Sequence, residues 1–291
     1  MQIGINSFGL NKVLSQNFTA GVLSLKEAGI SHLEPLIVFD FGRGLTASAL
    51  CAGLRRAGKD GGMWPVTLAA ERIEFLRRNG IAVYGAQISL VDQVPGGLTV
   101  QLEQLAAFAA QQELRYYVYS PKNGRLSDAA GEAEIFRKAI DALRPQGVEL
   151  YFHAHYNEFQ KENGDTVFDY LLREVPDLPI ELDVGWAQYA GRDPIRCMEQ
   201  YRDHIGLLHL KDLPAGADPQ NDPAHAFCAI GAGTLPLEAV LREAHRCPLK
   251  PYGMIIDQDN SAGDYLEDCR VGVRNICAAA QTLRTLRAEC F

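Results

Sequence analysis

Four runs of apolar residues in the second half of the chain carry a histidine or an aspartate near their ends. The runs are VELYFH, LPIELD, IGLLHLK and YGMIID, and these residues are His153, Asp183, His209 and Asp257. Imidazole nitrogens and carboxylate oxygens together suit Mn, Fe, Co or Zn, whereas calcium prefers oxygen alone. Carboxylates that face each other in a buried site repel unless a cation or a proton lies between them. We therefore predict that these four residues hold one divalent metal.

Two of the four positions have a neighbour of the same kind. The two-residue period of a strand places Tyr151, His153 and His155 on one face, so His155 is an alternative to His153 as ligand. Asp259 is likewise an alternative to Asp257. We prefer His153 and Asp257, which leaves His155 to support the ligands or to transfer protons.

Proton transfer at neutral pH needs a group whose pKa lies near neutral, and His155 or Glu158 can serve as the general base. Lys211 lies on the same face of its strand as His209. It is our candidate for stabilising a developing oxyanion, or for binding a hydroxyl or carboxylate of the substrate. The alternative is that Lys211 is a surface lysine at the end of a strand.

Three residues are candidates for substrate binding, namely Glu34, Trp186 and Asp259. Glu34 ends an apolar run and can point inward to bind a hydroxyl. Trp186, with Tyr156 and Phe8, offers aromatic surface to the C–H groups of a sugar. Packing without a role in binding is the alternative reading of Glu34 and of each aromatic residue.

Other histidines and the cysteines are assigned no chemistry. The cysteines are odd in number, scattered and without a C-x-x-C pair, so we expect reduced thiols. We expect hydrogen-bonded packing roles for the remaining histidines. The histidines are His32, His204, His225 and His245, and the cysteines are Cys51, Cys197, Cys228, Cys247, Cys269, Cys277 and Cys290.

The elements that must position these side chains alternate along the chain. Short runs rich in β-forming residues alternate with amphipathic stretches, which is typical of repeated βα units. About eight such runs, spaced by roughly 25–50 residues, predict an α/β fold, a (β/α)8 TIM barrel in a single domain over residues 1–291. They begin near residues 2, 31, 81, 114, 148, 178, 205 and 252.

Glycines at the boundaries between predicted helices and strands support these units. A helix is predicted from residue 67 to Asn79-Gly80, where the glycine supplies a left-handed cap, and glycines 29 and 147 precede strands in the same way. Long loops are expected at residues 37–64 and 212–234. Active sites of such barrels are built from loops after the strands, so either loop is a candidate lid or wall of the site.

Composition narrows the class of partner. The 291 residues include 28 Lys and Arg against 36 Asp and Glu, and this net charge of -8 repels a polyanion such as nucleic acid. No apolar run reaches the roughly 18 residues of a membrane span, and the first residues lack the features of a signal peptide. We expect a cytoplasmic protein with a small-molecule substrate and no membrane partner. The segment from Tyr265 to Phe291 can pack against a second copy in a homo-oligomer.

Several motifs, in order and spacing, resemble the xylose-isomerase-like TIM-barrel family of sugar phosphate isomerases and epimerases. That family also contains inosose dehydratases and endonuclease-IV-type enzymes, and the resemblance covers nearly the whole chain. The motifs are HAHYNEF at 153–159, ELDVGW at 181–186, GRDP at 191–194, HLKD at 209–212, IGAGT at 230–234 and DQDNS at 257–261.

The resemblance implies a metal held at the ends of strands five to eight, often by Glu, Asp, His and Glu. Carried over by position, these ligands fall on His153, Asp183, His209 and Asp257. Two positions depart from the common pattern, because His153 and the shorter Asp257 replace glutamates that also act as acid and base in the epimerases and ketose isomerases. A simple shuttle between two glutamates is therefore not expected here.

These observations predict a metal-dependent sugar isomerase or epimerase of carbohydrate metabolism. It would remove a proton next to a carbonyl of a ketose or keto-sugar through a metal-stabilised enediolate. Manganese is our first choice of metal, with Co, Fe, Zn or Mg as alternatives. The second hypothesis is a lyase, a dehydratase that expels a β-hydroxyl from an inosose or keto-sugar.

Two further hypotheses fit less well. An endonuclease-IV-like phosphodiesterase predicts a basic groove and several metals, whereas the acidic excess and a ligand set for one metal predict neither. A binding barrel without catalysis predicts an incomplete ligand set and no bound metal.

Overall fold

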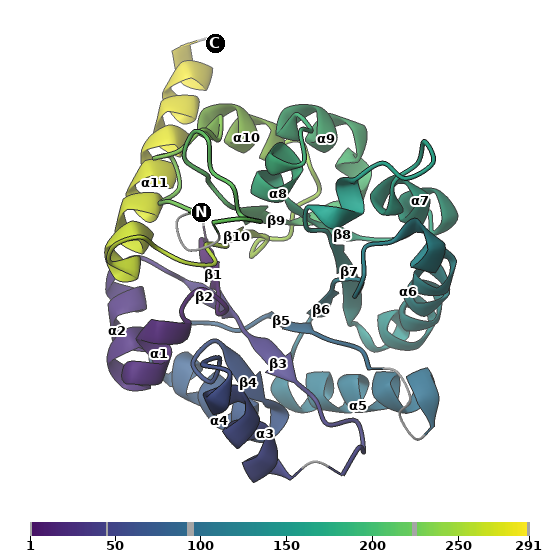
Figure 1. Ribbon diagram of the computed structural model, residues 1–291. Coiled ribbons are helices and arrows are strands. Elements are labelled where there is room, and N and C mark those ends of the chain that lie inside the picture. Colours follow the sequence, from purple (N-terminus) through teal and green to yellow (C-terminus); the bar gives the residue numbers. More distant parts are fainter. Residues whose placement is uncertain (1, 45, 92–95, 223–225, 290–291) are drawn as a thin grey trace.

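The computed structural model describes residues 2–44, 46–91, 96–222 and 226–289. Strands alternate with helices, and Figure 1 shows the helices outside a central arrangement of strands. The strands are β1 (Gly4–Asn6), β2 (His32–Glu34), β3 (Leu36–Val38), β4 (Met63–Pro65), β5 (Gly85–Ile88), β6 (Tyr116–Tyr119), β7 (Glu149–His153), β8 (Ile180–Asp183), β9 (Ile205–Leu210) and β10 (Met254–Ile256). The helices are α1 (Asn11–Gln16), α2 (Phe18–Glu27), α3 (Ala47–Arg56), α4 (Val66–Arg78), α5 (Gly97–Gln112), α6 (Ala129–Leu143), α7 (Val167–Glu174), α8 (Val184–Tyr189), α9 (Pro194–Gln200), α10 (Leu237–Ala244) and α11 (Tyr265–Glu289).

The strands form a ring of parallel neighbours. The order in the sheet is β2-β1-β10-β9-β8-β7-β6-β5-β3-β4. A parallel bridge from His32 in β2 to Ala82, just before β5, joins the two sides of the sheet. Since β2 and β3 follow each other at one position and β4 pairs with β3, the ring has eight positions. The predicted TIM-barrel fold is confirmed.

Two details differ from the sequence prediction. The run that begins near residue 31 forms two strands instead of one, because Pro35 has no N–H to donate and separates β2 from β3. The expected loop at 37–64 contains the end of β3, all of α3 and most of β4. The side chain of Thr46 accepts a hydrogen bond from Ala49 N and so caps α3. The sequence prediction missed this helix because the glycines around it indicated a loop.

The predicted helix boundaries agree better with the structure. The helix predicted from residue 67 is α4, and Gly80 follows it with a φ of 77° in the left-handed region, as expected for a glycine cap. Among the helices described, none is both long enough and apolar enough to cross a lipid bilayer.

The interior of the barrel has an apolar floor beneath a polar upper part. Near the amino ends of the strands, Tyr84 stacks on Tyr252 with ring centroids 4.4 Å apart, and Tyr116 stacks on Tyr252 at 5.6 Å. The Tyr116 hydroxyl donates to Glu34 Oε2 at 2.9 Å. This bond marks the change from aromatic packing to the polar side chains at the carboxyl ends.

The chain after β9 is held by one buried carboxylate. Asp212 Oδ2 accepts from the N–H groups of Gly231 and Gly233 at 2.8 and 3.0 Å, and Oδ1 accepts from Leu213 and Leu235 at 2.9 Å each. The loop predicted at 212–234 has no helix or strand in its described part, which leaves out residues 223–225. Hydrogen bonds to Asp212 therefore hold a segment that has no helix or strand of its own to fix its backbone.

Replacing Asp212 tests this role. We expect Asp212→Ala to lower the free energy of unfolding by about 2–4 kcal/mol, because four backbone donors lose a buried, charged acceptor. Urea denaturation measures the change, and Asp203→Ala at an exposed site is the control. Equal stability of the two variants would contradict the assignment.

Candidate functional site

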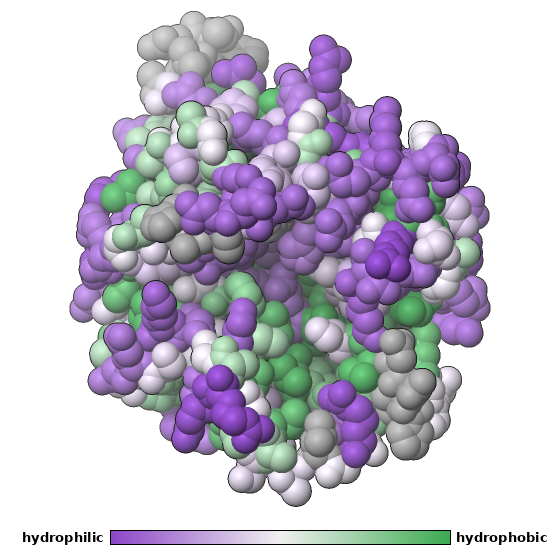
Figure 2. All heavy atoms as spheres, in the orientation of Figure 1, coloured by the Kyte–Doolittle hydropathy of each residue, from purple (hydrophilic) through white to green (hydrophobic). Residues whose placement is uncertain are grey.

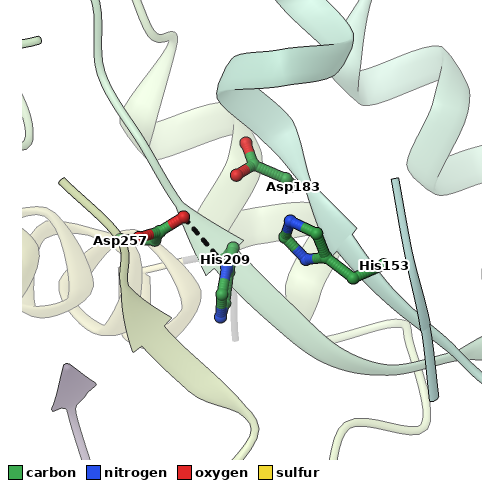
Figure 3. Close-up of side chains that lie close together, drawn as sticks. All are labelled: His153, Asp183, His209 and Asp257. Carbon is green, nitrogen blue, oxygen red and sulfur yellow. Dashed lines mark ion pairs between the residues drawn. The ribbon is translucent and has the colours of Figure 1, made fainter. Parts of the chain in front are cut away.

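The carboxyl ends of four adjacent strands bring four side chains together. His153 ends β7 and Asp183 ends β8, while His209 lies opposite Asp183 in the β8–β9 ladder and Asp257 follows β10 directly. One donor atom of each residue lies within 4.8 Å of the others, and all four residues are buried. Figure 3 shows the side chains converging from separate strands. The four residues predicted as metal ligands thus form one cluster.

Three atoms of this cluster lack hydrogen bonds. Within the described part of the chain, His153 Nε2, Asp183 Oδ2 and His209 Nδ1 are buried without a hydrogen-bonding partner. His209 Nδ1 lies 3.2 Å from Asp257 Oδ2, but the geometry is not that of a hydrogen bond. Buried polar atoms without partners destabilise a fold, and a cation would satisfy all three. The cluster therefore fits a metal ion.

The charges of the cluster also favour a cation. Burial raises the pKa of Asp183 to about 7, although the charge of Lys211 opposes this shift. Burial alone would lower the pKa of His209, but the charges of Glu181 and Asp257 outweigh it and raise that pKa well above its usual value. In the metal-free protein, protons on Asp183 and His209 therefore offset part of the negative charge.

Two glutamates lie deeper in the barrel against His209. Glu34 points inward as predicted, but its carboxylate is occupied by His209 Nε2 at 3.1 Å, Asn6 Nδ2 at 2.9 Å and the Tyr116 hydroxyl. Glu181 is fully buried and was missed by the sequence analysis. The signal was available, because Glu181 precedes Asp183 by two residues and so shares its face of the strand.

Lys211 is completely buried, so its interpretation as a surface lysine was wrong. Its Nζ lies 2.9 Å from both Asp257 Oδ2 and Asp259 Oδ2, and 4.6 Å from the centre of the Phe227 ring. Burial would lower the pKa of Lys211, but Asp257 and Asp259 outweigh it and raise the pKa. Lys211 therefore remains a cation that holds two carboxylates.

The two predicted general bases have different surroundings. His155 follows β7, lines a cavity at the carboxyl ends of the strands and keeps solvent contact, with its ring centroid 4.7 Å from that of His153. Loss of hydration within this concave site, with the positive field of neighbouring groups, lowers the pKa of His155. Glu158 is buried, and its Oε2 accepts from His155 N at 2.8 Å. Glu158 thus supports the chain that carries His155.

A cavity of about 230 Å³ opens beside the cluster. Asp257, Asp259 and His155 lie on its wall together with polar and apolar residues from the other strand ends. Of these further residues, Phe8 was predicted to offer aromatic surface to a sugar, but the sequence analysis did not assign the others, although several are polar groups at strand ends. The further residues are Asn6, Phe8, Leu36, Gln87, Ile88, Ser89, Val118 and Ser120. Figure 2 shows that this face is hollowed near its centre, with hydrophilic residues above the hollow and hydrophobic residues below.

Trp186 lies next to the site but is not part of the cavity wall. Its ring centroid is 5.9 Å from that of His155, and Lys211 Nζ lies 5.1 Å from the centre of its ring. Its backbone N–H donates to Asp183 Oδ1 at 2.8 Å, so Asp183 caps α8. Trp186 thus covers Lys211 and fixes one oxygen of a predicted ligand.

The residues without assigned chemistry lie mostly as expected. His32 contacts Ser31 Oγ at 3.0 Å and His204 contacts the carbonyl of Leu178 at 2.9 Å, whereas His245 is exposed instead of packed. The described cysteines are free thiols. His225 and Cys290 lie outside the described residues.

Residues 100–274 match the model of the family described as xylose isomerase-like TIM barrel. One curated relative is an inosose dehydratase of Geobacillus kaustophilus, 29% identical over 92 residues. That match covers 31% of this chain and 30% of the relative, so the chain matches less than a third of the dehydratase.

Solved structures share the fold over nearly the whole chain. A sugar phosphate isomerase/epimerase from Parabacteroides distasonis has a TM-score of 0.67 at 20% identity, covering 94% of this chain and 92% of that one. A probable 3-DHS dehydratase of petrobactin synthesis from Bacillus anthracis has a TM-score of 0.65 at 15% identity, covering 94% and 98%. At these identities the likeness establishes the fold alone.

Metal analysis tests the cluster directly. We expect about one divalent metal per chain after purification, and its loss in Asp183→Asn and His209→Ala. Asp183→Asn is the sharper variant, because asparagine can still cap α8 while the charge disappears. Asp193→Asn, at the exposed cap of α9, is the matched control. Metal retained in both cluster variants would refute the ligand assignment.

Metal affinity should also depend on pH. Because the pKa of Asp183 is about 7, a proton occupies this carboxylate below that pH and must leave when the metal binds. Since His209, whose pKa is raised well above its usual value, must release a proton as well, we expect the affinity for Mn²⁺ to fall by roughly a hundredfold per pH unit below pH 7. Calorimetry in buffers with different ionisation enthalpies measures the released protons. Constant affinity between pH 5.5 and 7 would contradict this expectation.

Proposed function

The chain belongs to the xylose isomerase-like TIM barrel family, and from this membership we propose that it is a divalent-metal-dependent sugar isomerase or epimerase. The observation that carries the proposal is the placement of His155 and Asp259 on the wall of one cavity, with the metal cluster beside them. His155 follows β7 and Asp259 follows β10, and β8 and β9 lie between these strands. Groups able to transfer a proton therefore flank the place where a substrate would contact the metal.

The metal would supply positive charge next to the carbonyl and so favour removal of the neighbouring proton. His155 would accept this proton, since a neutral imidazole has a free lone pair and lies on the cavity wall. Asp259 would hold or return a proton from the other side. Lys211 contacts Asp259 and Asp257 from behind and would keep both carboxylates in place.

The cavity wall supports a small substrate rich in hydroxyl groups. The side chains of Asn6, Gln87, Ser89 and Ser120 offer both donors and acceptors. Phe8 and Val118 provide apolar surface for the C–H groups of a sugar. With two imidazoles and two carboxylates, manganese is the proposed metal, and Co, Fe, Zn or Mg are alternatives.

Dehydration is the second candidate, favoured by the similarity to an inosose dehydratase. In that reaction His155 would take the proton next to the carbonyl, and the electron pair would form a carbon–carbon double bond as the β-hydroxyl leaves. A protonated Asp259 would supply the proton that makes the leaving group water. The same residues thus serve either outcome.

Incubation with a panel of ketoses and inososes in deuterated water distinguishes these reactions. Solvent deuterium in a recovered or isomerised sugar supports the isomerase or epimerase, and an absorbing enone with release of water supports the dehydratase. Absence of exchange with every substrate, while the metal is bound, would refute removal of a proton next to the carbonyl.

Substitutions then assign the proton-transfer groups. We expect His155→Gln and Asp259→Asn each to lower the exchange rate by roughly 10²–10⁴-fold, the usual contribution of general acid–base catalysis. Glu158→Gln should have a smaller effect, because Glu158 contacts the backbone of His155. A larger loss in Glu158→Gln than in His155→Gln would make Glu158 the base.

A further inference from the structure

One buried carboxylate joins the two histidines of the cluster. Glu181 Oε2 lies 2.9 Å from His153 Nδ1, and Glu181 Oε1 lies 3.1 Å from His209 Nε2. The side chain of Glu181 is fully buried, and its backbone pairs with His153 in the β7–β8 ladder. Glu181 therefore lies beneath the cluster at a position that the barrel itself fixes.

The chemistry of a carboxylate decides which nitrogens face the centre. A carboxylate oxygen accepts hydrogen bonds, so His153 Nδ1, which bonds to Glu181 Oε2, and His209 Nε2, which bonds to Glu34 Oε1, carry protons. The opposite nitrogens, His153 Nε2 and His209 Nδ1, are then the ones that can offer lone pairs to a metal, His209 Nδ1 after releasing the proton it carries in the metal-free protein. These are the same two nitrogens that are buried without a hydrogen bond.

We infer that Glu181 is a positioning residue that fixes the tautomer of His153 and directs its Nε2 toward the metal ion that His209 Nδ1, oriented by Glu34, also faces. This inference rests on the metal centre in the proposed function, but not on the reaction that the centre performs. A carboxylate behind a ligating imidazole also increases the electron density on the ligating nitrogen. Glu181 thus strengthens His153 as a ligand without contacting the metal or the substrate.

Glu34 offers an internal comparison. Of the two histidines it contacts only His209, and its carboxylate also accepts hydrogen bonds from Asn6 and Tyr116. Glu34→Gln should therefore act on His209 and Glu181→Gln on His153, because an amide replaces one of the two acceptor atoms with a donor. Metal affinity should fall in both variants.

The first measurement is histidine ¹⁵N NMR of the full-length protein loaded with Zn²⁺, a diamagnetic probe. We expect zinc to be bound through Nε2 of His153 and Nδ1 of His209, each with its other nitrogen protonated. Sequential backbone assignment of the isotope-labelled, zinc-loaded protein identifies the signals of the two histidines. Coordination of either histidine through the opposite nitrogen would overturn the inference, and this result does not depend on whether any Glu181 variant folds.

The second measurement is the Zn²⁺ dissociation constant, obtained by competition with a chelating dye. We expect Glu181→Gln to raise it by about 10–100-fold with an unchanged circular dichroism spectrum, and Glu181→Asp to recover part of the loss. Glu243→Gln is the matched control, since Glu243 is also buried but lies on the outer helix α10, where it pairs with Arg202 and Arg246. An effect of Glu181→Gln below about threefold would overturn the inference.

The two proposals fail in different ways. Zinc bound by the expected nitrogens, without deuterium exchange in any substrate, would leave the role of Glu181 intact and refute the proposed reaction. If a substrate exchanges deuterium while the histidines bind zinc through the opposite nitrogens, the proposed reaction is supported and the role of Glu181 is refuted. Absence of zinc binding by the unmodified protein would refute the metal centre and the inference together.

Discussion

The burial of several carboxylates at one end of the barrel is the constraint on which the rest of the site depends. Glu34, Glu181 and Asp183 are almost completely inaccessible, and Asp257 is nearly so. In such surroundings unbalanced charge is strongly unfavourable, so cations or protons must accompany these groups. Lys211 is the one buried lysine or arginine side chain among the described residues, which leaves negative charge for protons or a metal to balance. Charge balance thus links the fold to metal chemistry before any substrate is considered.

The parallel ladder explains how this charge is concentrated. Asp183 faces His209 across β8 and β9, and His153 faces Glu181 across β7 and β8. Alternation along β8 then places Glu181 and Asp183 on the same interior face, two residues apart along the strand. The aromatic floor around Tyr116 and Tyr252 fills the barrel below them. The polar residues are therefore stacked in two layers, an upper layer of predicted ligands and a lower layer in which Glu181 and Glu34 bond to His153 and His209.

The upper layer was predictable from sequence because it follows local rules. A two-residue period and the shared edge of parallel strands were enough to bring His153, Asp183, His209 and Asp257 together. The lower layer depends on which partner each side chain meets across the barrel, and no local pattern reports that Glu181 lies between two histidines. For the fold, the eight ring positions followed from the repeated units. Helix α3 was missed because its amphipathic pattern lies among glycines, and its capping Thr46 is a weak signal by itself.

Each of three predicted ligands uses one polar atom for the scaffold and leaves another facing the middle of the cluster. Asp183 Oδ1 accepts from the Trp186 N–H while Oδ2 has no partner, and both histidines contact Glu181 through one nitrogen and keep the other unpartnered. Asp257 differs, because Lys211 holds the same oxygen that faces His209. A site whose ligands are already oriented loses little conformational freedom when a metal binds, since the ordering was completed on folding. His155 and Asp259 lie on the cavity wall beside this preorganised cluster, where the proposed reaction would place its substrate.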